Sequence, residues 1–337
     1  MYHAPMENFF SHYALFLADT ATIVVAILVI AGGLVAIGKR KGKSGGQIQV
    51  TDLNRQLEAM GDSIQTARLS RKAGKALQKT RKAQRKAEAK SDSTKPCAYF
   101  LDFKGDLRAS ALAALREEIS AVLQAAQPGD EVLLRIESGG GMVNSYGLAA
   151  AQLLRLRAAK LPLTVMVDTV AASGGYLMAV VADRIIAAPF AMIGSIGVIA
   201  QIPNFHRWLR SKNIDMEQFT AGKFKRTVTL FGENTEAGRA KLREELEETH
   251  AHFRDFVQTY RSQLDLAKVA TGEAWLGSKA LELGLIDALG TSDDELLNAA
   301  KRAKVLAVHY QRKSTLPQRL GLAAQKSWDG LWQAPLS

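Results

Sequence analysis

Strand, helix and strand follow one another in CAYFLDFKGDLRASALAALREEISAVLQAAQPGDEVLLRIE, residues 97–137. Apolar, strand-like runs at 97–103 and 131–137 flank an amphipathic helical pattern at 110–126. The same alternation continues along the chain at 143–158, 163–168, 184–188, 236–264, 278–283, 293–303 and 305–311. Strands that alternate with helices predict an α/β domain with mostly parallel pairing, which we place at residues 97–312.

A long apolar run, ALFLADTATIVVAILVIAGGLVAI at residues 14–37, precedes this domain and contains one charge, Asp19. A helix of this length spans about 36 Å, enough to cross the ~30 Å hydrocarbon core of a bilayer. The run is longer than the apolar part of a signal peptide, and its positive charges follow it instead of preceding it. We therefore predict a short tail at 1–13 and a retained, single-pass anchor at 14–37, with the lipid bilayer as a partner.

The charges beside the anchor predict its orientation. No Lys or Arg lies before residue 14, whereas four lie at 39–43. Because positive charge is enriched on the cytoplasmic side of membrane proteins, this bias favours the cytoplasm for everything after the anchor. The opposite face stays open at this point.

The net charge of +11 is concentrated in one segment. Residues 39–90 hold fifteen Lys or Arg against four acids, an excess equal to the charge of the whole chain. Residues 52–89 read as one polar, basic helix within a linker at 38–96, either solvated or held on anionic lipid headgroups. Since the folded domain carries no excess positive charge, we expect no nucleic-acid partner.

The sequence contains little that could bind a metal or form a disulfide. Cys97 is the only cysteine, and no Cys/His cluster has metal-ligand spacing. His250 and His252 are two residues apart on a predicted helix, so they point to different sides. We expect no metal and no cofactor. The tail at 313–337 carries Leu and Trp among polar residues, and could contact the domain, another subunit or the membrane.

Two glycine clusters follow predicted strands, ESGGGMV at 137–143 and AASGGYLMA at 171–179. Glycines at a strand-to-helix junction can expose backbone N–H groups toward a bound oxygen. A serine framed by such glycines, as Ser173 is, presents its Oγ while leaving room for a substrate. Ordinary tight turns are the alternative interpretation.

A nucleophilic serine needs a base. Of the six histidines only His206 is a conceivable partner, since the others precede the anchor or lie in a charged helix or a late strand. A lysine can serve if burial lowers its pKa toward neutrality. The segment at 219–231, FTAGKFKRTVTLF, offers Lys223 and Lys225, which would share a face of a short extended run.

These motifs together resemble the signal peptide peptidase A family over about residues 97–300. The resemblance rests on Ser173 in ASGGYLMA, Ser195 in IGSIGV, Lys225 in GKFK, and AWLGSKALELGLIDALG at 274–290. It implies a ClpP/crotonase-like spiral of ββα units, with Ser173 as nucleophile, Lys225 as general base and Ser195 orienting the lysine. Oxyanion-hole positions match Gly174 and either Gly140 or Gly141. The family's usual Asn-Ser-Pro-Gly-Gly reads Glu137-Ser138-Gly139-Gly140-Gly141 here, so the choice between those two glycines stays open.

By that resemblance the chain is expected to be a membrane-anchored serine endopeptidase of the bacterial inner membrane. It would hydrolyse signal-peptide remnants, or unfolded or membrane peptides, through an acyl-enzyme, and it would form a homo-oligomer. Two alternatives stay open. One is a catalytically inactive membrane scaffold with a peptidase-like domain, and the other is a crotonase-type acyl-CoA enzyme.

Overall fold

The computed structural model describes residues 16–17, 20–25, 46–88, 95–222 and 224–311. The chain divides into two compact units. The elements described below belong to the unit at residues 48–311, apart from Gln47, the first residue of β1 (Gln47–Asp52). Most of the predicted anchor at 14–37, and all of the tail at 313–337, lie outside the described residues. Among the residues that are described, no helix is long and apolar enough to cross a bilayer.

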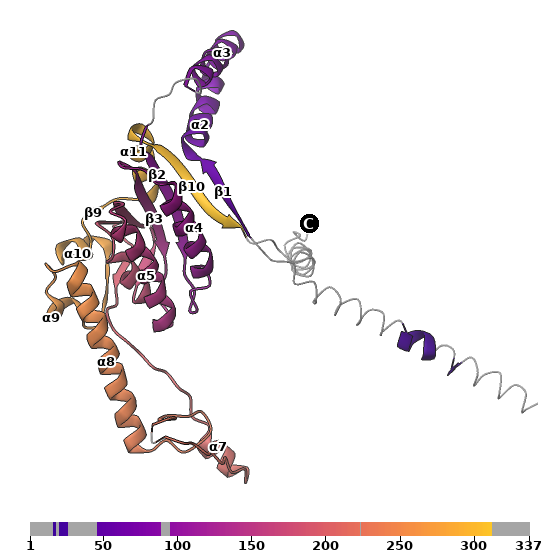
Figure 1. Ribbon diagram of the computed structural model, residues 1–337, viewed down its shortest axis with the longest axis vertical. Helices are drawn as coiled ribbons and strands as arrows, with labels where there is room; N and C mark the ends of the chain where they lie inside the picture. Colours follow the sequence, from indigo (N-terminus) through magenta and orange to yellow (C-terminus); the bar gives the residue numbers. More distant parts are fainter. Residues whose placement is uncertain (1–15, 18–19, 26–45, 89–94, 223, 312–337) are drawn as a thin grey trace, which may run out of the picture. The chain divides into compact units, whose positions relative to one another are not determined.

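A seven-stranded sheet forms the centre of the domain (Figure 1). The strand order is β1 (Gln47–Asp52), β10 (Lys304–Gln311), β2 (Cys97–Lys104), β3 (Glu131–Glu137), β4 (Leu163–Val167), β6 (Arg184–Ala187) and β9 (Ala288–Leu289). The pairs from β10 to β9 are all parallel. This confirms the α/β fold and the mostly parallel pairing predicted from the sequence.

Successive side chains of a strand point to opposite sides of the sheet, and both faces of the central strands are buried. On β3, Val132 and Leu134 pack into the larger core, whereas Leu133 packs into a smaller one on the other face. The larger core receives α4 (Leu112–Ala125), α5 (Val143–Ala158) and α6 (Gly174–Ala179). The smaller core receives α11 (Ser292–Arg302) and Leu53, the first residue of α2 (Leu53–Arg68).

A second, three-stranded sheet lies beside the carboxyl end of the first. It consists of β5 (Val170–Ala172), β7 (Met192–Gly194) and β8 (Ala274–Leu276), with β5 and β7 parallel and β7 and β8 antiparallel. The chain passes from β4 in the large sheet to β5 in the small one and then into α6, and from β6 to β7 in the same way. The small sheet therefore receives a strand from each of two consecutive units.

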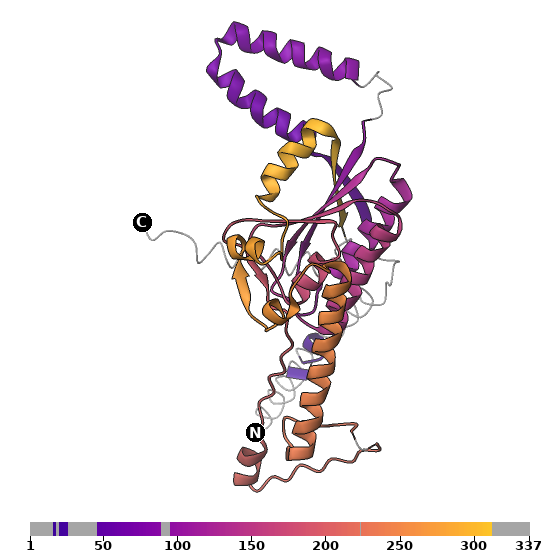
Figure 2. The same cartoon turned by 90° about the vertical axis from the view of Figure 1, so that its left-hand side faces the viewer.

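The segment predicted as one basic helix at 52–89 is a pair of helices, α2 (Leu53–Arg68) and α3 (Arg71–Glu88) (Figure 2). The break falls at Leu69 and Ser70, where Ser70 accepts the N–H of Ala73 and begins the second helix. Asn54 ties the pair to the domain, because its side-chain amide donates to the carbonyls of Ala300 and Ala303. The prediction of a single helix was wrong, since a serine that can cap a new turn interrupts it.

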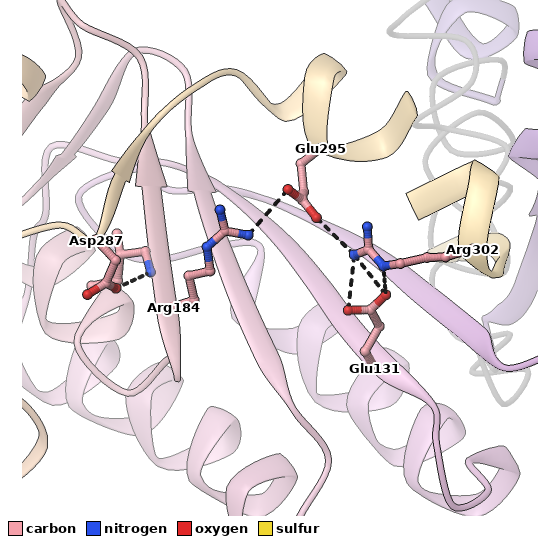
Figure 3. A network of polar contacts seen from close by, with 6 residues as sticks. Glu131, Arg184, Asp287, Glu295 and Arg302 are labelled. Carbon is pink, nitrogen blue, oxygen red and sulfur yellow. Dashed lines mark hydrogen bonds and ion pairs between the residues drawn. The ribbon is translucent and has the colours of Figure 1, made fainter. Parts of the chain in front are cut away.

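Charged side chains join the helices to the sheet on the side shown in Figure 3. Arg302 bonds Glu131 and Glu295, and Glu295 also pairs with Arg184. Arg261 follows α8 (Glu236–Tyr260), is 4% exposed, and makes two 2.9 Å bonds to the carboxylate of Asp287. These bonds fix the carboxyl end of α8 against the domain.

The amino end of α8 carries a long connection from β7, residues 198–235, which we call the arm (Figures 1 and 2). The described part of the arm contains one short helix, α7 (His206–Ser211), and its hydrogen bonds are mainly to other residues of the arm. Asn204 donates to the carbonyls of Thr229 and Gly232, and the N–H of Phe205 donates to Leu230. Exposed apolar side chains of the arm include Ile199, Trp208, Ile214, Met216 and Phe219.

The remaining helices, α9 (Leu266–Val269) and α10 (Gly277–Glu282), follow α8 and flank β8. The sequence predicted α10 and α11 to within one residue. It also predicted the helix at 143–158, which α5 matches, whereas the helix predicted at 236–264 ends earlier, at Tyr260.

Candidate functional site

Ser173 stands at a sharp turn between β5 and α6. Its φ of 51° and ψ of −120° are in a region that L-residues rarely adopt. Two backbone bonds hold it there, since its N–H donates to Gly194 and its carbonyl accepts from Leu177, at 2.8 and 2.9 Å. A strained serine at a strand-to-helix turn presents its Oγ outward, as a nucleophile requires.

The two predicted glycine clusters lie side by side. Ser138 of the first cluster donates its N–H to Val170 and accepts the N–H of Ala172, which joins the cluster to β5. A Cβ on Gly140 would lie 2.7 Å from both Gly174 N and Ser173 Cβ. Only glycine allows these two turns to approach so closely.

Gly140 and Gly141 differ in what their N–H groups do. The N–H of Gly140 donates to Ser138 Oγ at 3.1 Å. The backbone of Gly141 packs against Leu107, where an added Cβ would lie 2.3 Å from the carbonyl oxygen. Within the described residues no partner accepts the N–H of Gly141 or of Gly174, the first residue of α6. Both amides are therefore available to a ligand beside Ser173.

An apolar pocket of about 430 Å³ opens at Ser173. It lies between α5 and α8, with Ser173, Gly174 and Leu177 of the turn and α6 between them. Its other lining residues are Gly141, Val143, Tyr146, Gly147, Ala150, Gly197, Val198, Thr249, His252, Phe253 and Phe256. A pocket of this size and character accepts an apolar group of a ligand.

Ser195 lies directly after Gly194, whose carbonyl accepts the N–H of Ser173. Its φ is 52°, and its N–H donates to Glu273 at 2.7 Å. The structure therefore brings Ser195 to the same junction as Ser173. The next carbonyl, of Ile196, lies 3.2 Å from His250 Nε2, so α8 holds this loop from the other side.

Two histidines of α8, His250 and His252, lie near Ser173 although the sequence did not predict them there. His250 contacts Ile196, while His252 lines the pocket. Their different contacts agree with the two-residue offset on a helix. Only the tertiary contacts of α8 identify these histidines, because a histidine in a charged helix has no distinctive sequence pattern. His206 lies on the arm and does not line the pocket.

Lys225 is exposed on the arm and does not line the pocket. The extended run predicted at 219–231 is absent, since the described residues of this segment form turns and bends. Lys241 Nζ lies over the ring of Phe224, 5.6 Å from the ring centroid. Along α8, Lys241 precedes the pocket residue His252 by eleven residues, or about 16 Å of helix. Within one chain, Lys225 is therefore separated from the pocket that contains Ser173. Lys223 lies outside the described residues.

Among the described residues, no group of three or more His, Cys, Asp or Glu side chains is placed to hold a metal ion. What the described site offers is a serine, two free amides and an apolar pocket. These parts suit acyl transfer, in which a nucleophile attacks a carbonyl and donors stabilise the oxyanion.

Comparisons with known proteins agree with this chemistry. Residues 8–153 match the N-terminal part of peptidase family S49, and residues 155–306 match peptidase family S49 itself. Probable protease SohB of Haemophilus influenzae is 46% identical over 334 residues, 96% of this chain and 95% of that protein. Probable protease SohB of Buchnera aphidicola subsp. Schlechtendalia chinensis is 45% identical over 303 residues, 86% of this chain and 99% of that protein.

A solved structure, the 1510-N membrane-bound stomatin-specific protease, superposes on 61% of this chain and 85% of its own with 14% identity. The TM-score of this superposition is 0.42. The two sequence relatives, aligned over nearly their whole length, confirm the resemblance to the signal peptide peptidase A family and its SohB-type peptidases. The chain belongs to peptidase family S49 and is a serine-type peptidase.

Proposed function

We propose that the chain is a membrane-anchored endopeptidase with a Ser173/Lys225 dyad, and that its domain is a ClpP/crotonase-like spiral of ββα units. The observation that carries the proposal is the strained turn at Ser173, which faces two free amides and an apolar pocket. The passage of consecutive units from the large sheet to the small one supports the spiral. Membership of peptidase family S49 favours an active peptidase over an inactive scaffold or an acyl-CoA enzyme.

In this mechanism the uncharged amine of Lys225 takes the proton of Ser173 Oγ while Oγ bonds to the peptide carbonyl carbon. The amides of Gly174 and Gly141 stabilise the oxyanion, and losing one such donor costs about 3 kcal/mol. We assign Gly141 rather than Gly140 because Ser138 already accepts the N–H of Gly140. The C–N bond then breaks, and the ammonium of Lys225 protonates the leaving amine.

Water completes the cycle by attacking the ester that joins the acyl group to Ser173. Lys225 takes a proton from the water, and Ser173 regains its own as the carboxylate product leaves. Ser195 orients the lysine in this proposal, which its place beside Gly194 supports. The lysine loses its charge only where water is excluded, so it has to enter the apolar pocket region.

Lys225 reaches Ser173 either by a movement of its own arm or from the arm of a second copy. The exposed apolar side chains of the arm support the proposed homo-oligomer, because large exposed apolar patches mark interaction surfaces. Inactive Ser173→Ala and Lys225→Ala proteins, mixed under conditions that exchange subunits, distinguish the two routes. Recovered activity assigns the lysine to a neighbouring copy, and its absence assigns it to the same chain.

The proposed anchor at 14–37 places the enzyme in the bacterial inner membrane, where substrates would be signal-peptide remnants or unfolded or membrane peptides. The charge bias at 39–43 favours a cytoplasmic domain over a periplasmic one. Protease accessibility of the carboxyl terminus in intact spheroplasts tests this orientation. Digestion from outside would place the domain in the periplasm.

The activity test uses denatured casein and a fluorophosphonate probe. Wild-type protein should cleave casein and take up the probe at Ser173, whereas Ser173→Ala should do neither. Lys225→Ala should lose cleavage by about a thousandfold or more, as for other residues of a catalytic unit. Lys212→Ala, an exposed lysine of the same arm, is the matched control and should keep activity. Full cleavage of casein by Lys225→Ala would refute the assignment of Lys225 as the general base.

A further inference from the structure

Helix α3 packs on α2 along one of its faces (Figure 2). Gly74 lies against Thr66, where an added Cβ would come 3.1 Å from the side-chain methyl carbon. Two turns further along, Arg81 Nε donates to Asp62 Oδ1 at 3.1 Å, and Leu77 between them is half-buried. Positions 74, 77 and 81 are three and four residues apart, so they define the face of α3 that meets α2.

The side of α3 away from α2 is cationic. At about 100° of rotation per residue, five exposed cations fall within one sector of the helix that is about 100° wide. Among the described residues no acid pairs with any of the five, and the acid in the sequence of α3, Glu88, is its last residue. The cationic face consists of Arg71, Lys72, Lys75, Lys79 and Lys82.

The cationic face is fixed to the peptidase domain through α2. Asn54 accepts the N–H of Val305, the second residue of β10, at 2.7 Å. Its amide also donates to the carbonyls of Ala300 and Ala303, and Leu53 packs against the smaller core. A surface that binds α3 therefore also holds the large sheet, through α2 and β10.

We infer that the cationic face binds the phosphate headgroups of anionic lipids and so sets which side of the peptidase domain faces the bilayer. The inference rests on the proposed anchor at 14–37 and adds a second contact with the membrane. Fifteen residues separate residue 37 from Leu53, a tether of at most about 55 Å that keeps the helical pair close to a bilayer.

Charge complementarity favours a lipid surface as the partner. Each cation near an anionic leaflet strengthens binding about fivefold, so five cations on one face form a strong combined contact. A nucleic acid fits less well, because the sequence of α3 contains no aromatic residue on which a base could stack.

The experiment reconstitutes the full-length protein in vesicles of phosphatidylcholine, alone or mixed with phosphatidylglycerol, and measures amide hydrogen exchange. With phosphatidylglycerol, exchange at residues 71–82 should slow about tenfold or more at low salt, because bound lipid opposes opening of the helix. At about 1 M salt, where the screening length is about 3 Å, this protection should disappear. The strands of the large sheet should exchange equally in both kinds of vesicle.

Lys75→Gln/Lys79→Gln/Lys82→Gln removes three of the five cations and leaves the face that packs on α2 unchanged. Glutamine is about as favourable in a helix as lysine, so α3 should still form. The affinity of the helix for phosphatidylglycerol should fall about a hundredfold, and the protection of residues 71–82 should be lost.

Lys160→Gln/Lys268→Gln/Lys279→Gln is the matched control, since it removes three exposed lysines of the domain outside α3. It should keep the protection. A control variant that loses the protection as fully as the α3 variant would overturn the inference, and so would equal exchange of the wild type in both kinds of vesicle. Single-stranded RNA binding that only the α3 variant loses, without any lipid effect, would assign the face to nucleic acid instead.

Failure of the proposed anchor looks different from failure of this inference. Without an anchor, alkaline washing would release the wild-type protein from both kinds of vesicle. A protein that resists the wash but shows no protection by phosphatidylglycerol contradicts the role of the cationic face alone.

Discussion

Ser173 and Lys225 lie in regions of the molecule that are held in opposite ways. Ser173 lies where both glycine clusters and β7 meet, with backbone bonds to Gly194 and Leu177. Lys225 is exposed on the arm, and its N–H donates to the carbonyl of Gly222 in the same turn. The proposed nucleophile belongs to the packed domain, whereas the proposed base belongs to a segment whose hydrogen bonds stay mainly within that segment.

This difference indicates how the peptidase could control its activity. The serine and the amide donors form when the domain folds, because they need the same close packing that the core needs. In the proposed mechanism, the lysine then has to reach the serine by a movement of the arm or from a second copy. The proposed enzyme would keep the strained serine without its base until that contact forms. Substitutions in the two regions should therefore separate stability from activity.

The largest expected effect on both quantities comes from the glycine junction. A Cβ on Gly175 would lie 2.4 Å from the carbonyl oxygen of Ser138, which joins the first cluster to β5. Gly175→Ala should destabilise the protein by about 1–3 kcal/mol, the usual cost of overpacking. Because the junction also sets Ser173, activity should fall by about a hundredfold or more, as when an oxyanion donor is misplaced.

Gly61→Ala is the matched control for this variant, since an added Cβ at Gly61 meets no atom within 4 Å. Gly61 lies on α2, away from the pocket lining. Thermal unfolding and peptide hydrolysis are measured on both proteins. A Gly175→Ala protein with unchanged unfolding and activity would contradict the picture of a rigid junction.

A substitution in the arm should lower activity while the stability of the protein changes little. Asn204 donates to the carbonyls of Thr229 and Gly232 and so closes the arm on itself. Asn204→Ala should lower kcat/KM about tenfold through misplacement of the lysine. The free energy of unfolding should change by less than about 1 kcal/mol, because the bonds are partly exposed.

Hydrogen exchange at residues 229–232 gives an independent measurement of the arm. Exchange there should accelerate in Asn204→Ala while the strands of the large sheet keep their protection. Should the variant instead lose as much stability as Gly175→Ala, the arm would be part of the cooperative core, and the contrast with Ser173 would disappear.

The sequence predicted the rigid region better than the arm, for a physical reason. Buried parallel strands are continuous apolar runs, so EVLLRIE predicted β3, and its neighbours followed from alternation with helices. Three-residue strands such as β5 and β7 carry too few residues for a periodic pattern. None of the described arm residues belongs to a hydrophobic core, so burial does not decide the structure there. The alternation of Phe and Lys at 219–225 suggested a strand where the described residues form turns and bends.

The candidate site divides in the same way. Ser173 and its glycines were identifiable because the turn needs those residue types at those positions. His250 and His252 were not, since their contacts come from α8 meeting the Ser173 turn in space. A histidine inside a helix leaves no signal that a sequence pattern can detect.

The smallest expected effect concerns the pH dependence of stability, and it comes from a buried carboxylate beside the large sheet. Glu118 of α4 is buried beside β10, where its carboxylate accepts the N–H of Tyr310. Burial raises the pKa of Glu118 above its ordinary value of 4.5. The folded protein then binds this proton more tightly than the unfolded chain does, so stability is lost as pH rises through the raised pKa.

Glu118→Gln keeps the acceptor for Tyr310 but carries no charge, so it removes this loss. Its Tm should equal that of the wild type near pH 4.5 and exceed it by about 1–3 °C at pH 7.5. Peptide hydrolysis should be unchanged, because Glu118 does not line the pocket. A Tm difference that is the same at both pH values would rule out the buried charge as its cause. A change in hydrolysis would show that the surroundings of β10 are coupled to the site at Ser173.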